Sequence, residues 1–179
     1  MEIGLRVGYL YWYGGVIMKK GFIGIIVLSF SIYISMLYLA LFSRHGSTGL
    51  SMLTLQYLRF NANFIPFKTI ITYFNMLTDG GVNTKIAIRN LAGNLFLFLP
   101  FGFYLPFFTK KMKRLSIFII TVAGLIIIIE VMQGITRRGS IDVDDLILNL
   151  LGAFIGFMLC KHTPIRSLFK YCAHQAEQA

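Results

Sequence analysis

The chain has 179 residues, of which 56% are hydrophobic and only 13% are charged. A soluble domain carries about 25% charged residues, so this composition argues against a soluble enzyme. It also argues against a nucleic-acid-binding module, despite the net charge of +10. An apolar and basic chain is typical of a membrane protein whose cations mark its topology. The length predicts an all-α membrane bundle of about four helices of about 20 residues each.

The first 17 residues are aromatic and too short to span a membrane. Met18-Lys19-Lys20 then precedes a long apolar run, which is a common start for a membrane protein. We hypothesise that Met18 is the biological start and that residues 1–17 are a doubtful N-terminal extension. The alternative is an interfacial aromatic segment.

Four apolar runs follow, each long enough for a membrane-spanning helix. We expect spans at residues 21–42, 91–108, 115–135 and 143–160, within a membrane domain of residues 18–162. The second run contains Pro100 and Pro106, which neighbouring helices or water can accommodate inside a membrane. Residues 163–179 are expected to form a cytoplasmic tail.

The cations predict the orientation of the spans. They cluster before the first span, between the second and third, and after the fourth, as Lys19, Lys20, Lys110, Lys111, Lys113, Arg114, Lys161, Arg166 and Lys170. Four spans place all three clusters on one side, and the positive-inside rule makes that side cytoplasmic. We therefore expect a multi-pass protein of the cytoplasmic membrane with both termini inside. The cysteines Cys160 and Cys172 and the histidines His45, His162 and His174 form no metal or redox motif.

The loop between the first and second spans is not simply polar. Apolar residues recur at helical spacing over residues 64–77, with Pro66 placed in the first turn. Two interpretations remain open: an amphipathic helix on the outer membrane surface, or a helix packed over the outer end of the bundle. Asp79-Gly80-Gly81 is expected to end it in a turn.

Polar side chains inside the spans are costly, and here they converge on one place. In the predicted topology, seven of them lie near the outer ends of the second, third and fourth spans: Asn90, Asn94, Glu130, Gln133, Asp144, Asp145 and Asn149. Arg137, Arg138 and Asp142 lie in the short turn above them. We interpret these ten residues as a candidate ligand-binding or functional cluster.

Each member also has an interpretation that needs no ligand. Asn90 and Asn94 could form interhelical hydrogen bonds, and Asp144 and Asp145 could be an N-cap and a first-turn acid of the fourth span. Arg137 and Arg138 could anchor the chain at the interface. Glu130 is harder to explain, because a carboxylate at that depth needs a partner such as one of these arginines or an asparagine of the second span. Gly152 and Gly156 form a GxxxG pattern that favours close helix packing.

Three sequence blocks resemble the signature of the VanZ-like family. They are Asn63-Phe-Ile-Pro66-Phe67, the run from Asn90-Leu-Ala-Gly93-Asn94 to Phe98-Leu-Pro100-Phe101-Gly102, and the run from Glu130-Val-Met-Gln133 through Asp144-Asp145 to Gly156. The order and spacing of all three agree with the family, over roughly residues 21–159. The resemblance implies a bacterial cell-envelope membrane protein, most frequent in Gram-positive bacteria, from a family whose founder gives low-level teicoplanin resistance. It implies no agreed catalytic or metal-binding residue.

Two main hypotheses follow. In the first, the protein is a non-enzymatic binder or modulator at the outer leaflet, whose partners are membrane lipids and a lipid-linked cell-wall precursor or lipoglycopeptide. In the second, it is a membrane enzyme that acts on a lipid-linked precursor through Glu130, Asp142, Asp144 and Asp145. The three aspartates are weak candidates for holding Mg²⁺ in that case, and otherwise no cofactor is expected. Transport through an oligomer is a weaker third interpretation, and the sequence does not set the oligomeric state.

Overall fold

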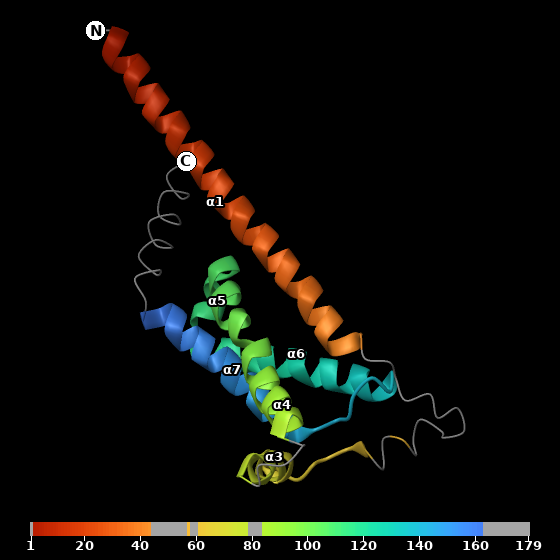
Figure 1. The fold of residues 1–179 in the computed structure, drawn as a ribbon. Coiled ribbons are helices and arrows are strands. Elements are labelled where there is room, and N and C mark those ends of the chain that lie inside the picture. Colours follow the sequence, from red (N-terminus) through yellow and green to blue (C-terminus); the bar gives the residue numbers. More distant parts are fainter. Residues whose placement is uncertain (1, 44–56, 58–60, 79–83, 163–179) are drawn as a thin grey trace.

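The computed structural model describes residues 2–43, 57, 61–78 and 84–162 (Figure 1). The described part is helical, with α1 (Glu2–Phe42), α3 (Lys68–Thr78), α4 (Thr84–Leu97), α5 (Leu99–Phe108), a 3-10 helix η1 (Lys110–Lys113), α6 (Leu115–Ile135) and α7 (Val143–His162). Its one β-type contact is an isolated bridge between Asn63 and Asp142. The predicted all-α class is therefore confirmed.

Four helical stretches are long and apolar enough to cross a membrane. They cover Ile23–Phe42, Thr84–Phe108, Leu115–Ile135 and Val143–His162. The four predicted spans are confirmed, and the third has the predicted bounds. The fourth continues to His162, because nothing in its last turn breaks the helix before the described residues end.

The second span begins earlier than predicted and is broken in the middle. It starts at Thr84 rather than at residue 91, and it divides into α4 and α5 at Phe98. Pro100 lies at the start of α5, where a missing N–H group costs no intrahelical hydrogen bond. Phe98, at the break, and Phe101, in the first turn of α5, are both buried in the core of the bundle.

Helix α7 is at the centre of the bundle and contacts α4, α5 and α6. The core that these helices share consists of large apolar side chains, with Phe98, Phe118, Val122 and Ile126 fully buried. Leu95 of α4 contacts Gly152, and Leu99 of α5 contacts Gly156, so the second span runs parallel to α7. Both helices therefore begin at the same end of the bundle, and α6 ends there.

Helix α1 is continuous from Glu2 to Phe42 and extends well past the other helices (Figure 1). Its attachment to the bundle is partly polar. The Tyr33 hydroxyl donates to the Leu97 carbonyl at 2.7 Å, and the Tyr104 hydroxyl donates to Ser29 at 3.0 Å. The helix has no break at Met18, and the hypothesis about the start codon stays a prediction.

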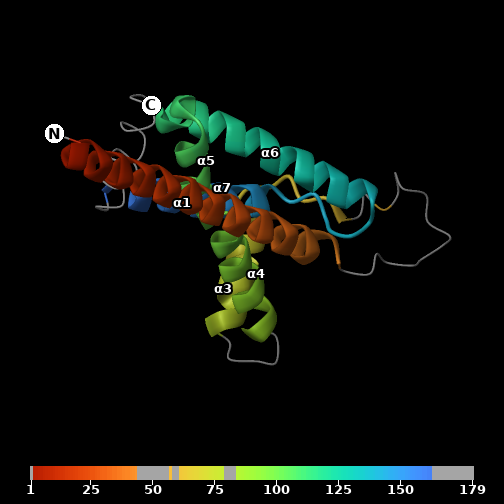
Figure 2. The same ribbon diagram turned by 90° about the horizontal axis from the view of Figure 1, so that it is seen from above.

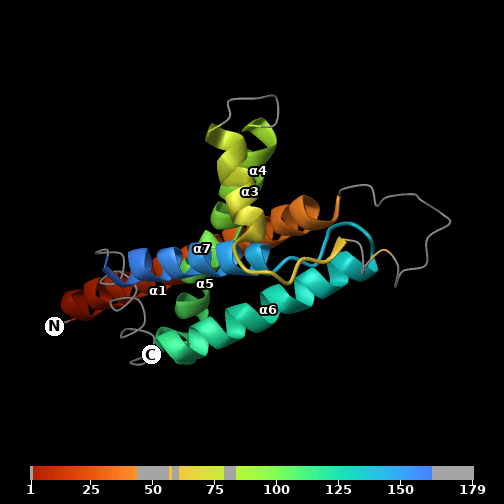
Figure 3. The same ribbon diagram turned by 90° about the horizontal axis from the view of Figure 1, so that it is seen from below.

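Helix α3 is shorter than the predicted helix of residues 64–77. Pro66 precedes it, and Phe67 has a left-handed backbone with φ of 66°, so the helix begins only at Lys68. Helix α3 packs against α4, and both project to the side of the bundle (Figures 2 and 3). We call α3 the arm. The turn expected at residues 79–81 and the tail of residues 163–179 lie outside the described residues.

Candidate functional site

Asp144 binds the start of α3 from the first turn of α7. Its carboxylate accepts hydrogen bonds from the backbone N–H groups of Phe67 at 2.5 Å, Thr69 at 2.7 Å and Ile70 at 3.1 Å. Asp144 has no exposed surface. The first N–H groups of a helix have no partner within it, and a negative charge there is favourable. Asp144 therefore caps α3 rather than its own helix, which corrects the N-cap assignment considered from the sequence.

The N-cap position of α7 belongs to Asp142 instead. Its Oδ1 accepts the N–H of Asp144 at 2.9 Å, and Oδ1 also accepts the Asn63 amide at 2.9 Å. Its Oδ2 accepts the Thr69 hydroxyl at 2.7 Å. The bridge beside it adds the backbone pairs Asn63 N–H to Ile141 O and Val143 N–H to Asn63 O. We call Asp142 and Asp144, with these partners, the carboxylate clasp.

Gln133 and Arg138 hold the end of α1. The Gln133 side chain donates to the Leu41 carbonyl at 3.0 Å, and the Arg138 guanidinium donates to the Phe42 carbonyl. The last carbonyls of a helix lack intrahelical partners and favour a nearby cation. These two candidates therefore tie α1 to α6. Arg138 is thus not the partner that the sequence offered for Glu130.

Arg137 occupies a helix-ending position that glycine usually takes. Its φ is 55°, its N–H donates to the Gly134 carbonyl, and the next N–H donates to the Gln133 carbonyl. These two bonds are the Schellman pattern that ends a helix. The turn directs the chain from α6 back toward the start of α7, so it determines which groups α7 presents beside Glu130.

Both asparagines of α4 bond to other helices. The Asn90 amide donates to the Tyr73 hydroxyl of α3 at 2.9 Å, and the Asn94 amide donates to the Asp145 carboxylate of α7. Asn90 therefore holds the arm, whereas Asn94 and Asp145 join the two parallel spans at the end where both begin.

Glu130 and Asn149 are buried and poorly satisfied. Glu130 is 6% exposed, and its Oε2 accepts the Asp142 N–H at a long 3.4 Å. Its carboxylate also lies near enough to Asp145 and Asp142 to interact with them electrostatically. Asn149 is 3% exposed, and its Oδ1 has no hydrogen-bond partner in the described part of the chain. A buried polar atom without a partner costs about 1–3 kcal/mol, so such an atom calls for an explanation.

We call Asn94, Glu130, Asp145 and Asn149 the polar core. It differs from the carboxylate clasp because its groups lie between membrane-spanning helices α4, α6 and α7 rather than on the arm. Asp145 and Asn149 are one turn apart on the same face of α7. Two carboxylates and an unbonded amide oxygen are hydrogen-bond acceptors, which suits a ligand that brings donor groups.

Two glycines allow α7 to approach the second span closely. A Cβ at Gly152 would overlap the Leu95 carbonyl, and one at Gly156 would overlap the Leu99 carbonyl. The backbones are in contact here, so the helix faces from Gly152 onward leave no room for a ligand. The polar core therefore ends where this contact begins.

The magnesium hypothesis named Asp142, Asp144 and Asp145. Asp142 and Asp144 direct their oxygens to protein donors in the clasp. Among the described residues, no three His, Cys, Asp or Glu side chains are placed to share one metal ion. The carboxylate of Asp145 receives the Asn94 amide.

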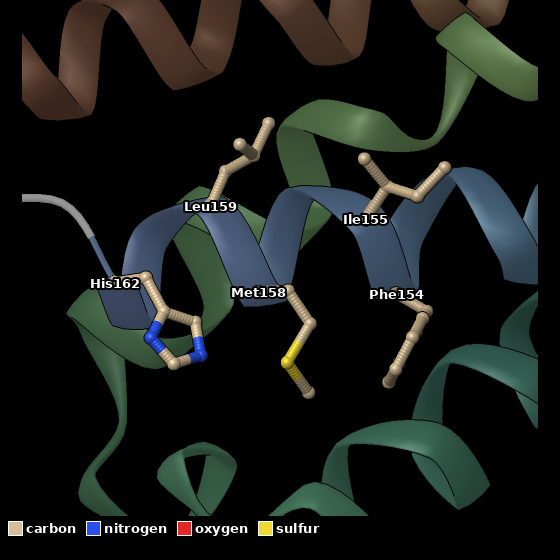
Figure 4. A pocket seen from close by; sticks show the side chains of 5 residues that line it. All are labelled: Phe154, Ile155, Met158, Leu159 and His162. Atoms are coloured by element: carbon tan, nitrogen blue, oxygen red, sulfur yellow. The ribbon is translucent and has the colours of Figure 1, made fainter.

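A separate apolar hollow lies at the other end of α7. It is lined by Phe154, Ile155, Met158, Leu159 and His162. Figure 4 shows Ile155 and Leu159 on one side of the helix, with Phe154, Met158 and His162 on the other. The hollow is distant along the helix from Asp145 and carries one polar side chain, so it is not part of the polar core.

Three residues that organise this end of the bundle received no role from the sequence. Asn63 and Thr69 belong to the carboxylate clasp, and Tyr73 receives Asn90. The signal that pointed to the first of them was the block that begins at Asn63. Its spacing resembled the family signature, although its partner Asp142 is far along the chain.

Comparison with known proteins gives one family. A family profile described as VanZ/LLP1 matches residues 27–169, which is most of the 179-residue chain. The matched region includes the clasp, the polar core and all of α3 to α7. No curated protein and no solved structure gave a significant match.

Proposed function

The chain belongs to the VanZ/LLP1 family of membrane proteins, and from this premise we propose that it is a non-enzymatic binding protein of the cell envelope. Its ligand is a lipid-linked cell-wall precursor or a lipoglycopeptide, which it meets at the outer leaflet of the cytoplasmic membrane. Both termini are cytoplasmic in this proposal, because the cations of residues 110–114 and Lys161 in the last turn of α7 lie at the end opposite the polar core. Low-level resistance to teicoplanin would follow from altered access of the drug to its target.

The observation that carries the proposal is the state of Glu130 and Asn149. Both are buried among membrane-spanning helices, where polar groups are costly unless they serve a function. Glu130 has one long hydrogen bond, and the Asn149 Oδ1 has none in the described part. Peptide and sugar portions of the proposed ligands offer the N–H and O–H donors that these acceptors lack. The clasp, in contrast, is satisfied by the protein's own donors.

Binding to purified protein tests the proposal. The protein is reconstituted in nanodiscs and titrated with a polyprenyl-diphosphate-linked cell-wall precursor and, separately, with teicoplanin. We expect Glu130→Gln and Asn149→Leu each to weaken binding about tenfold, which corresponds to about 1.4 kcal/mol. Gln133→Leu is the matched control, because it changes a polar residue one turn along α6 that holds only the α1 carbonyl.

Two results would contradict the proposal. Unchanged affinity in both Glu130→Gln and Asn149→Leu would mean that the polar core does not bind the ligand. Metal-dependent release of product from the precursor would favour the enzyme hypothesis, in which the acidic residues act as general acid, general base or Mg²⁺ ligands.

A further inference from the structure

The surface of α3 is divided into three faces. Five residues on the first face are half-buried, and this face packs against α4 and the bundle: Thr69, Ile70, Tyr73, Met76 and Leu77. A second face exposes Lys68, Thr72 and Asn75, which are polar. Between them lies a third face with Ile71 and Phe74, exposed by 56% and 61%, and Phe67, directly before the helix, is 55% exposed. The helix is therefore packed on the bundle and still leaves an apolar face uncovered.

The apolar face continues into the segment before the helix. Phe64 is 73% exposed and Ile65 is 61% exposed. We call Phe64, Ile65, Phe67, Ile71 and Phe74 the apolar ridge. Isolated exposed apolar residues are ordinary, but five within residues 64–74, three of them phenylalanines, mark a surface that contacts something apolar.

The carboxylate clasp fixes the depth of the ridge in the membrane. Helix α7 has 20 residues and is about 30 Å long, which equals the thickness of the hydrocarbon layer. Its first turn therefore lies at the boundary between hydrocarbon and head groups. Asp144 belongs to that turn and binds the N–H groups at the start of α3. The ridge is consequently level with this boundary.

The direction of α3 agrees with this placement. Helix α3 runs crosswise to α7 in Figures 2 and 3, and Figure 1 shows it nearly end-on while α7 lies across the view. A helix crosswise to a membrane-spanning helix lies along the membrane plane. An amphipathic helix in this position buries its apolar face in the outer part of the acyl region.

The charge of α3 and of the start of α4 selects the kind of lipid. Lys68 of α3 and Lys85 and Arg89 of α4 are exposed, and neither helix contains an acidic residue. Cations beside an inserted apolar face are attracted to anionic head groups, at about 1 kcal/mol for each residue near the surface. The phenylalanine side chains match the acyl layer of an anionic leaflet, and the basic residues beside them match its head-group layer.

From these observations, we propose that the apolar ridge is a membrane-contact surface that inserts into an anionic lipid leaflet, with Lys68, Lys85 and Arg89 on the head groups. This goes beyond the binding function proposed above, because it concerns the arm and not the polar core. The clasp links the two, since Asp142 joins the arm to the loop beside Glu130. A second copy of the chain is the competing occupant, and the experiment distinguishes it.

Tryptophan fluorescence tests the insertion. The sequence has one tryptophan, Trp12, and Trp12→Phe gives a silent background. Phe74→Trp then reports on the ridge, and Asn75→Trp reports on the polar face one residue away. Both are placed in vesicles of phosphatidylcholine and phosphatidylglycerol at three to one. We expect lipids brominated on their acyl chains to quench Phe74→Trp at least threefold more than Asn75→Trp, and aqueous acrylamide to show the reverse order.

The lipid preference is measured by brominating either the phosphatidylglycerol or the phosphatidylcholine. At equal mole fraction, brominated phosphatidylglycerol should quench Phe74→Trp more than brominated phosphatidylcholine, and the triple variant Lys68→Gln, Lys85→Gln, Arg89→Gln should remove the difference. Equal quenching in the parent overturns the anionic preference. Phe74→Trp accessible to acrylamide overturns insertion. Shielding from both quenchers means that protein covers the ridge, which also overturns the proposal.

Discussion

Asp144 shows how a single carboxylate at the residue scale positions an element distant in sequence. It forms hydrogen bonds with three N–H groups at the start of α3. A hydrogen bond to a charged group contributes about 1.5–3 kcal/mol. We expect Asp144→Ala to open the start of α3, with amide hydrogen exchange at Phe67, Thr69 and Ile70 about tenfold faster or more. Exchange measured by mass spectrometry in detergent micelles checks this.

The neighbouring acid supplies the control. Asp145→Ala changes the same turn of α7 but loses the contact with Asn94 instead. The amides at the start of α3 should therefore keep their protection from exchange. Asp144→Asn retains one acceptor oxygen and should give an intermediate rate. Unchanged exchange in Asp144→Ala would mean that the arm is held by its packing on α4 alone.

Sequence reasoning identified the polar residues of the site but not most of their roles. The cost of placing polar side chains in a membrane is local information, and it drew attention to Glu130 and Asn149, both of which the structure buries. The partner of Asp144 is not local, because the bonded residues are 74 to 77 positions away. The same separation concealed the role of Gln133, whose acceptor is 92 positions away at the end of α1.

At the scale of elements, the contact between α7 and the second span depends on missing side chains. A Cβ at Gly156 would overlap the backbone at Leu99. Overpacking of a close contact costs about 1–3 kcal/mol. We expect Gly156→Ala to lower the apparent melting temperature in detergent by several degrees. Gly93→Ala is the matched control, because it lies in α4 and meets nothing within 4 Å. Equal melting temperatures in the two variants would contradict the close packing.

The bounds of the elements were predictable where hydropathy alone determines them. The third span has no charged residue before Glu130 near its end, and its predicted and observed bounds agree. The second span was predicted too short because Lys85 and Arg89 interrupt its hydropathy, although the backbone is helical through both. The start of α3 depends on the left-handed Phe67 and on a carboxylate from another helix, neither of which a periodic pattern contains.

At the scale of the whole molecule, the direction of the spans decides which solution each end faces. The second span and α7 begin at the end that holds the polar core, whereas η1 joins α5 to α6 at the opposite end. Lys110, Lys111 and Lys113 all lie in η1. The positive-inside rule acts on short loops of this kind, so we expect η1 to be cytoplasmic and the turn after α6 to be external.

Cysteine labelling in intact cells measures this orientation. In a background of Cys160→Ser and Cys172→Ser, the exposed residues Lys113 and Thr136 are replaced one at a time by cysteine. An impermeant maleimide should label Thr136→Cys from outside and should reach Lys113→Cys only after the cells are opened. The two positions are at opposite ends of α6. Membrane leakage would label Lys113→Cys in addition to Thr136→Cys, whereas a reversed orientation would label Lys113→Cys in its place. Labelling of Lys113→Cys alone in intact cells would mean that the orientation is the reverse of the expected one. The polar core and the apolar ridge would then lie at the cytoplasmic leaflet.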